Sequence, residues 1–259
     1  MTRLVHIADL HFGDEDARLV ADFIDGLGAL SADVVVVAGD LTQTGSKREF
    51  AQAAEFLEAI KCPTVLTPGN HDTPLLNIGA RLTRPWRRLQ KAIGEHADDR
   101  WWSEAVQIES FNSSRGTQLR LDWSLGVVSE KKLTDPLAAL DASEAATKVL
   151  TAHHPIVSPL AQRGRARTLR ADKFAKPIAS AADLILTGHL HQSFACPLDI
   201  QGRRSWFVGA ATAFSSRTRD EPAGFNVIEA EAASFDWTRY VASEGRFEKT
   251  DTSRLDRKL

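Results

Sequence analysis

Short apolar runs alternate with amphipathic stretches through the first 70 residues, and this alternation constrains the fold more than any other feature. Apolar, strand-like runs cover 4–8, 33–39 and 63–69, and helical periodicity covers 16–30 and 47–60. Such β-α-β-α-β order is typical of parallel strands with helices packed outside them. The sequence therefore predicts an α/β fold that begins with a parallel sheet.

Polar residues stand where each of these three strands should end. Asp9 and Asp40 are 31 residues apart, and Asp40 and Asn70 are 30 apart, close to the ~30 residues of one strand-helix-strand unit. Ligands of open α/β sheets bind outside the carboxyl ends of the strands. We therefore expect these three loops to form one site.

Further strand-like runs follow in the second half of the chain. They lie at 105–111, 125–129, 148–153, 183–188, 206–210, 225–230 and 235–241. This strand-rich half predicts a second sheet.

The bulk composition favours one ordinary globular domain over residues 1–259. Hydrophobic residues make up 43% and charged residues 25%, as in soluble globular proteins. The segment 73–103 breaks the strand-helix rhythm, and we interpret it as a cap-like insertion with one or two helices interrupted near Pro85. The tail at 243–259 is highly charged, and we expect its end to be frayed.

Charge and cysteine content restrict the partners and the compartment. The formal net charge is −2, from 32 basic and 34 acidic residues, so no global field draws the chain to nucleic acid polymers or anionic membranes, although local patches stay possible. Cys62 and Cys196 fit neither a disulfide framework nor a thiolate metal site. The opening residues lack a signal peptide and no transmembrane segment follows, so we expect a cytoplasmic protein, and a homo-oligomer is compatible with the sequence.

Three motifs end the first three strands. Asp9-Leu10-His11 places two potential ligands at i and i+2, on one side of an extended chain. Taken alone, this aspartate could equally cap the following helix or turn. Gly39-Asp40 after four valines, and Gly69-Asn70-His71-Asp72, could each be a polar turn, but that interpretation weakens as candidate ligands accumulate at one edge.

Histidines complete the set. His153-His154-Pro155 and Gly188-His189-Leu190-His191 each follow an apolar run, and six of the eight histidines of the chain lie in these strand-end motifs. A chance distribution of surface histidines does not account for this clustering at strand ends. His6 and His96 lie outside the motifs, and we interpret them as structural, His6 in a strand and His96 in a solvated helix or loop.

Carboxylate, amide and imidazole ligands without thiolate suit Mn, Fe, Co, Ni or Zn, and seven ligands are too many for one tetrahedral ion. Two ions ~3.5 to 4 Å apart can share a bridging carboxylate and a hydroxide that attacks at neutral pH. Asp40 comes from the middle of the first three strands and is the natural bridge.

The ordered motifs, spread over residues 9–191, resemble those of the calcineurin-like metallophosphoesterase superfamily. Its fold would be a four-layer αββα sandwich of two mixed sheets flanked by helices. The resemblance implies a dinuclear site held by Asp9, His11, His191, Asn70, His153 and His189, with Asp40 bridging, and favours Mn, Fe or Zn. It also implies that His71 acts on the phosphoryl group, and Asp72 could orient His71.

The segments HIADLHFG, VVVAGDLTQTGSKREF and VLTPGNHDTPL look most like the class III cyclic nucleotide phosphodiesterase branch, which also hydrolyses glycerophosphodiesters. A metal-dependent phosphodiesterase of small diesters is therefore our leading hypothesis. The alternative is phospholipase C-type hydrolysis of a phospholipid, since the insertion and the segment 209–231 are similar to bacterial relatives of that kind. A non-catalytic metal-binding scaffold is the rival of another class, and it would show decayed ligands.

Substrate contacts are expected from Asn70, His71 and His154 and from two basic clusters. Such clusters are usually solvated faces, but these follow directly on ligand loops, so Arg84 and Arg165 are candidates for phosphate binding. The clusters comprise Arg81, Arg84, Arg87, Arg88 and Lys91, and Arg163, Arg165, Arg167, Arg170 and Lys173. Trp86, Trp101 and Trp102 are expected to anchor the insertion, and the role of Arg217 and Arg219 is open.

Overall fold

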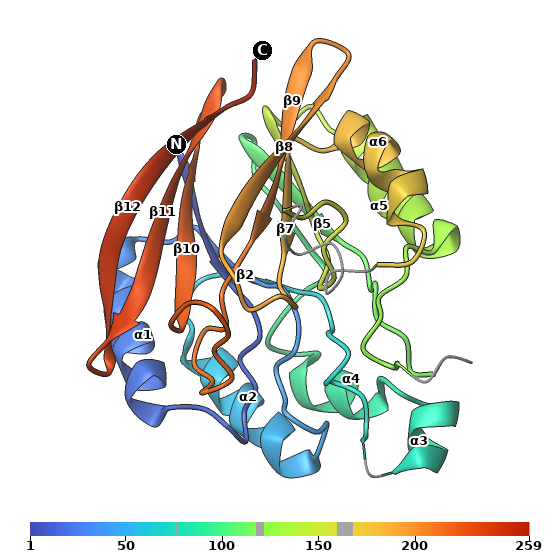
Figure 1. Cartoon of the computed structure of the whole chain (residues 1–259), viewed down its shortest axis with the longest axis vertical. Coiled ribbons are helices and arrows are strands. Elements are labelled where there is room, and N and C mark those ends of the chain that lie inside the picture. Colours follow the sequence, from blue (N-terminus) through green and yellow to red (C-terminus); the bar gives the residue numbers. More distant parts are fainter. Residues whose placement is uncertain (76, 118–121, 160–167, 259) are drawn as a thin grey trace.

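Two six-stranded β-sheets pack face to face, and helices cover their outer faces (Figure 1). The computed structural model describes residues 1–75, 77–117, 122–159 and 168–258. The four-layer αββα sandwich expected from the sequence is confirmed.

The first sheet has the order β12-β11-β10-β1-β2-β3. Its strands are β1 (Thr2–Ile7), β2 (Val34–Val37), β3 (Thr64–Leu66), β10 (Gly224–Ala230), β11 (Ser234–Ser243) and β12 (Arg246–Asp256). β1, β2 and β3 are parallel, as predicted, whereas β10, β11 and β12 pair antiparallel. Helices α1 (Ala17–Leu30) and α2 (Lys47–Ala59) cover its outer face.

The valine run of β2 shows how the layers form. Val35 and Val37 pack with apolar residues of α1 and α2, whereas Val34 and Val36 pack between the two sheets. Successive side chains of a strand point to opposite faces, so a strand buried on both faces must be apolar throughout.

The second sheet has the order β4-β5-β6-β7-β9-β8. Its strands are β4 (Arg100–Trp102), β5 (Val106–Ser110), β6 (Thr147–Thr151), β7 (Leu184–Thr187), β8 (Phe194–Ile200) and β9 (Arg203–Gly209). β5, β6, β7 and β9 are parallel, and the two edge strands are antiparallel. Helices α5 (Glu130–Ala142) and α6 (Ala171–Ala181) cover its outer face.

The segment 73–103 contains two helices, α3 (Ile78–Thr83) and α4 (Arg87–Ile93), which lie on either side of Pro85. The predicted interruption is therefore confirmed. The end of the segment forms β4, at the edge of the second sheet. Leu89 and Ile93 attach α4 to the core around α2.

Two expectations about strands are wrong. Residues 125–129 form no strand, because only Val127 pairs, through an isolated bridge to Leu169. The charged end of the chain is not frayed up to Asp256, because β12 pairs with β11 along its length and buries Leu255. An outer strand needs only one paired edge and can present charged side chains to water.

None of the described helices combines the length and apolar character needed to cross a bilayer.

Candidate metal centre and active site

The loops that follow β1, β2, β3, β6 and β7 meet at one edge of the sandwich, where the parallel strands of both sheets end. One group of side chains there is Asp9, His11 and His191. Asp9 Oδ1 lies 3.2 Å from His191 Nε2 and 3.9 Å from His11 Nε2, and the two Nε2 atoms are 3.2 Å apart. Three ligand atoms this close surround a volume suited to one ion.

A second group lies beside the first and shares Asp9 with it. Asp9, Asp40 and His153 place one ligand atom each within 4.8 Å of one another, and Asp40 Oδ2 lies 3.2 Å from His153 Nε2. The His189 ring is centred 5.2 Å from that of His153. Asn70 borders the same cavity as Asp40 and His189. The structure thus brings together all seven residues predicted as ligands.

Several of these residues adopt an unusual backbone conformation. Asp9, His11, Asp40, His189 and His191 have φ between 49° and 70°. The left-handed region is disfavoured for residues other than glycine, and such strain gathers at functional sites. The expectation that Asp9 and His11 sit on an extended chain is therefore wrong, although their side chains do converge.

Two motif glycines permit the close approach of the loops. A Cβ atom on Gly39 would lie 2.7 Å from His153 Nδ1, and one on Gly69 would lie 2.0 Å from Asp40 Oδ1. A side chain at either position would collide with a ligand residue, so both positions require glycine.

The pKa values of the two ligand carboxylates, Asp9 and Asp40, are lowered. Burial by itself would raise the pKa of Asp9, but His191 and then His153 outweigh it and lower the pKa to about 2. Burial also opposes ionisation of Asp40, yet His153 holds the pKa of that carboxyl well below its usual range.

The imidazoles divide into two kinds. Burial lowers the pKa of His11 to about 4 and that of His189 to about 3, so both rings are neutral and can offer a lone pair. Burial would also lower the pKa of His153, but the adjacent Asp40 raises it to about 9. The Asp40 carboxylate therefore attracts positive charge to the place where a metal ion would lie.

Unsatisfied buried atoms test whether these residues fit a metal. Asp9 Oδ1, Asn70 Oδ1 and His153 Nε2 are buried without a well-directed hydrogen bond among the described residues, although Asp9 Oδ1 and His153 Nε2 each lie 3.2 Å from a group of opposite charge. Leaving such a group unpaired costs about 1–3 kcal/mol. Ligation would satisfy all three atoms, so the donor set fits metal binding.

The outer nitrogens of two imidazoles are held by backbone carbonyls. His153 Nδ1 lies 2.7 Å from the Ala38 oxygen, and His191 Nδ1 lies 2.6 Å from the Arg217 oxygen. Donation from Nδ1 leaves the Nε2 lone pair facing the site, which is how a ligating imidazole is oriented in metalloproteins.

His71 borders the cavity as expected, but Asp72 does not orient its ring. His71 Nδ1 lies 2.7 Å from the Gln43 carbonyl oxygen instead. Asp72 is fully buried and accepts hydrogen bonds from the Gly69 and Thr42 backbone N–H groups at 2.8 and 3.0 Å. Burial raises the pKa of Asp72 to about 7, and the contacts make it a brace between two ligand loops.

His154 is not available to a substrate. Its ring nitrogens lie 2.9 Å from Ser113 Oγ and 2.8 Å from the Ser124 oxygen, and the residue is fully buried. Arg84 does not border the active-site cavity, where it was predicted to bind phosphate. It borders a separate cavity that none of the ligands lines. Arg165, together with Arg163 and Arg167, lies outside the described residues.

A family model for calcineurin-like phosphoesterases matches residues 2–193. The chain belongs to the calcineurin-like phosphoesterase family. It is therefore a metal-dependent phosphoesterase, and the predicted resemblance is confirmed.

Two curated relatives of this phosphoesterase are cyclic nucleotide phosphodiesterases. A probable cyclic nucleotide phosphodiesterase of Synechococcus sp. is 28% identical over 88% of this chain and 87% of its own. The 3′,5′-cyclic adenosine monophosphate phosphodiesterase CpdA of Escherichia coli is 28% identical over 66% of this chain and 58% of its own. Both names agree with the expected class of phosphoric diester hydrolases.

The fold also resembles a purple acid phosphatase from yellow lupin seeds. The TM-score is 0.69 at 14% identity, over 98% of this chain and 53% of the phosphatase. This likeness concerns the arrangement of the layers alone.

The active-site cavity of the phosphoesterase has a volume of about 710 Å³, and two arginines border it together with ligands of the site. Arg217 Nη1 donates to Gln43 Oε1 at 3.0 Å and lies 3.5 Å from His71 Nε2. Arg219 borders the same space. The sequence left the roles of Arg217 and Arg219 open. Their loop follows β9, a strand parallel to β7. The rule that ligands bind at the carboxyl ends of parallel strands could therefore have placed both arginines at the site.

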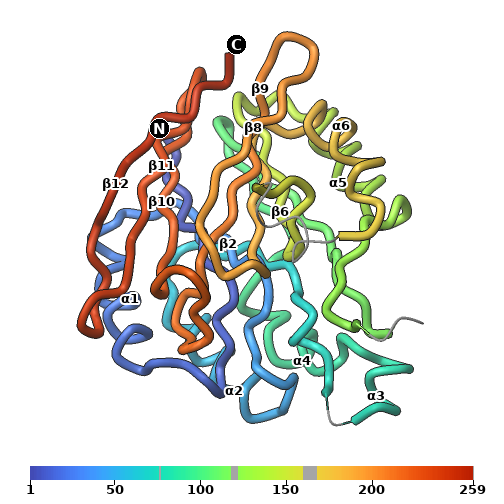
Figure 2. The backbone as a smooth tube through the Cα atoms, viewed as in Figure 1, coloured from blue at the N-terminus to red at the C-terminus, as the bar shows by residue number. Residues whose placement is uncertain are grey.

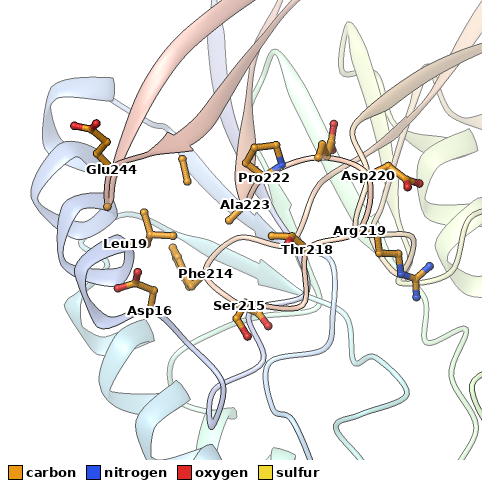
Figure 3. A pocket seen from close by; sticks show the side chains of 14 residues that line it. Asp16, Leu19, Phe214, Ser215, Thr218, Arg219, Asp220, Pro222, Ala223 and Glu244 are labelled. Atoms are coloured by element: carbon orange, nitrogen blue, oxygen red, sulfur yellow. The ribbon is translucent and has the colours of Figure 1, made fainter.

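A second cavity of about 590 Å³ lies on the other side of the loop that bears these arginines. Figure 3 shows Leu19 and Glu244 on its one side, with Arg219 and Asp220 leaving the loop on the other. None of the seven ligands borders this cavity. Arg219 and Asp220 thus form a wall shared by the two spaces.

Proposed function

We propose that this chain is a dinuclear phosphodiesterase that hydrolyses small phosphodiesters, either cyclic nucleotides or glycerophosphodiesters. The single observation that carries the proposal is the pair of adjacent ligand groups that share Asp9, with buried ligand atoms left unpaired. The names of the relatives favour diesters over other phosphate esters.

Two groups of residues would hold the metals. Asp9, His11 and His191 would hold one ion, and Asn70, His153 and His189 the other, with Asp40 between them. Mn, Fe or Zn held there would lower the pKa of a water molecule so that it is nucleophilic at neutral pH, and would offset the charge of the phosphoryl oxygens.

His71 would move a proton at Nε2. Its Nδ1 is engaged by the Gln43 carbonyl oxygen, so the other ring nitrogen serves the cavity. A proton on Nε2 can stabilise a phosphoryl oxygen or pass to the leaving oxygen.

Arg217 and Arg219 would bind the anionic substrate. Both arginines border the cavity that Asp40, His189 and His191 also border, so a diester phosphate bound there can contact the guanidinium groups. Guanidinium groups suit phosphate oxygens because of their planar array of donors.

A phospholipid substrate is the second candidate. A smaller cavity of about 190 Å³ adjoins the site at Asn70 and His71 and is bordered by Trp123 and the exposed Leu75. This space could take the apolar part of a leaving group.

The experiment that tests the proposal compares Asp40→Ala with His71→Asn. Asp40→Ala should lose both bound metal and turnover, whereas His71→Asn should keep its metal and lose about 10²- to 10⁴-fold in kcat. Metal content by elemental analysis and hydrolysis of a chromogenic diester provide the measurements. Asp141→Ala, which removes an exposed carboxylate of α5, is the control.

Substrate identity requires a panel. Hydrolysis of 3′,5′- and 2′,3′-cyclic nucleotides, glycerophosphodiesters and phosphatidylcholine should be compared in the presence of Mn, Fe or Zn. A preference for phosphatidylcholine would favour the second candidate.

The site assignment has its own contradicting outcome. Wild-type metal content and turnover in Asp40→Ala would show that the metal site is assigned wrongly.

A further inference from the structure

Basic side chains from α2, α3 and α4 surround one cavity, called the cationic cavity below. It has a volume of about 650 Å³. The three helices lie at the end of the molecule opposite both chain termini (Figure 2). The basic residues that line the cavity are Lys47, Arg84, Arg87, Arg88 and Lys91.

Helical spacing brings these cations to one place. Arg87 and Lys91 are four residues apart in α4, so they lie on the same side of the helix. Arg84, at the end of α3, comes four residues before Arg88. Lys47 is the first residue of α2 and adds a fifth charge from a different part of the chain.

The described parts of the chain do not balance these charges. None of the described residues that line the cavity is acidic. No ion pair joins any of the five cations to a carboxylate within those parts. Like charges four residues apart, such as Arg87 and Lys91, destabilise a helix. A bound anion would offset this repulsion.

The wall of the cavity is held in place by the rest of the protein. Arg88 Nη1 donates to the Gly45 oxygen at 2.7 Å, which joins α4 to the loop after β2. Leu89 and Ile93 attach the inner side of α4 to the core, and the buried Arg81 anchors α3. Since the wall is already fixed, less conformational freedom is lost when a ligand binds.

The number of charges indicates the class of ligand. A phosphate monoester carries about 1.5 to 2 negative charges at neutral pH, so one phosphate balances fewer than half of the five positive charges. Two phosphates balance about three or four of them. Three of the five cations are arginines, whose planar donors match phosphate oxygens. The volume of the cavity is also typical of sites for small ligands.

We propose that the cationic cavity is a second anion-binding site, which takes a small molecule that carries two or more phosphate groups. Arg84, Arg87 and Arg88 contact the phosphate oxygens, and the two lysines add positive charge. The site is separate from the metal centre, because none of the seven predicted ligands lines it. It depends on no step of the proposed reaction.

Isothermal titration calorimetry of the full chain with its metals bound tests the proposal, with fructose 1,6-bisphosphate as the probe. The wild type should bind the bisphosphate at least about tenfold more tightly than fructose 6-phosphate, because a second phosphate adds charged hydrogen bonds. Added salt should weaken this binding. Equal affinity for the two sugar phosphates, or no binding of the bisphosphate, would overturn the proposal.

Two double variants locate the binding site. Arg84→Gln/Arg87→Gln should weaken bisphosphate binding by about tenfold or more, because it removes two phosphate donors. Arg246→Gln/Lys249→Gln removes the same charge from exposed positions of β12 that do not border the cavity, and should change the affinity by less than about twofold. Thermal unfolding and turnover of a small diester should be near wild type in both variants.

A third variant separates the cationic cavity from the metal centre, which Arg217 and Arg219 also make attractive to anions. Asp40→Ala should keep the wild-type affinity for the bisphosphate, because Asp40 does not line the cationic cavity. Binding that is lost in Asp40→Ala and kept in Arg84→Gln/Arg87→Gln would place the anion at the metal centre and overturn the proposal. Binding of oligonucleotides without binding of the bisphosphate would identify a polymer ligand and also overturn it.

Discussion

Gly69 lies so close to Asp40 that a larger residue cannot be accommodated without moving the carboxylate. A Cβ atom there would lie 2.0 Å from Asp40 Oδ1 and 2.3 Å from the Asp40 nitrogen. Backbone atoms on a neighbouring strand end cannot rotate away as a flexible side chain can. The metal centre thus depends on a residue that has no ligand atom.

Gly69→Ala should therefore lose bound metal and at least about 100-fold in kcat/KM, since shifts near 1 Å cost that much at reacting centres. Gly26→Ala in α1 is the matched control, because a Cβ atom there meets nothing within 4 Å. It should keep full activity and gain about 0.5–1 kcal/mol in free energy of unfolding. Wild-type metal content in Gly69→Ala would contradict the role of this close approach.

Arg217 connects the cavity wall to His71 through Gln43. Arg217→Gln should raise KM for an anionic diester about tenfold, because a hydrogen bond to a charged group is worth about 1.5–3 kcal/mol. The effect on kcat should be smaller if Arg217 binds substrate and His71 handles the proton. Steady-state kinetics separate the two constants, and an unchanged KM would exclude substrate binding by Arg217.

At the level of elements, the first turn of α2 is tied to the loop that follows β2. Ser46 and Glu49 form a reciprocal capping box, and Glu49 also accepts from the Thr44 nitrogen and hydroxyl at 2.8 and 2.6 Å. Burial would raise the pKa of Glu49, but the hydrogen bonds from Thr44 and Ser46 outweigh it and lower the pKa. The ionised form is therefore the stabilising one.

Glu49→Gln should lower the free energy of unfolding by about 1–2 kcal/mol at pH 7. A pKa lowered by folding gives stability that is fully present above the ordinary value of 4.5 and is lost as pH falls through the folded pKa. The difference between the two proteins should thus shrink below about pH 4.5. Urea unfolding at several pH values provides the measurement, with the exposed Glu55→Gln as control; a constant difference at all pH values would contradict the linkage.

Elements could be predicted where the side-chain pattern is strong. The apolar run of β2 and the amphipathic pattern of α2 gave both elements within a few residues. Helices α5 and α6 were not predicted, and each contains an internal proline, Pro136 and Pro177, which interrupts the usual pattern. β12 was missed because its charged side chains conceal the backbone pairing that forms it.

At the scale of the whole molecule, Arg257 joins the two sheets. It follows β12 in the first sheet, and its Nη2 lies 2.8 Å from Asp183 Oδ1, beside β7 of the second. It also donates to the Ala146 oxygen at 2.9 Å and to Thr147 Oγ1 at 3.2 Å. The end of the chain thus closes the sandwich opposite the metal centre.

Arg257→Ala should reduce the free energy of unfolding by about 2–3 kcal/mol, because Asp183 is buried and several acceptors lose their donor. Arg203 still pairs with Asp183, which limits the loss. Arg254→Ala, whose ion pairs are more exposed, should cost at most about 1 kcal/mol. Chemical denaturation provides the measurement. Equal losses in the two variants would show that the contacts of Arg257 between the sheets stabilise the fold no more than exposed ion pairs do.

The sequence by itself determined the order of β1, α1, β2, α2 and β3, the candidate ligands and the edge of the sheet where they meet. These follow from local periodicity and from the rule that parallel strands end on one side. The cytoplasmic location, the oligomeric state and the cap role of 73–103 stay predictions.

Only the tertiary structure decided what each neighbouring residue does. Asp72 and His154 stand in the motifs yet brace loops, Arg84 lies at a separate cavity, and Arg217 reaches His71 from a loop 146 residues later. Hydrogen-bond partners come from segments far apart in the chain, so a local pattern can name a candidate ligand but cannot show which atoms remain free to bind.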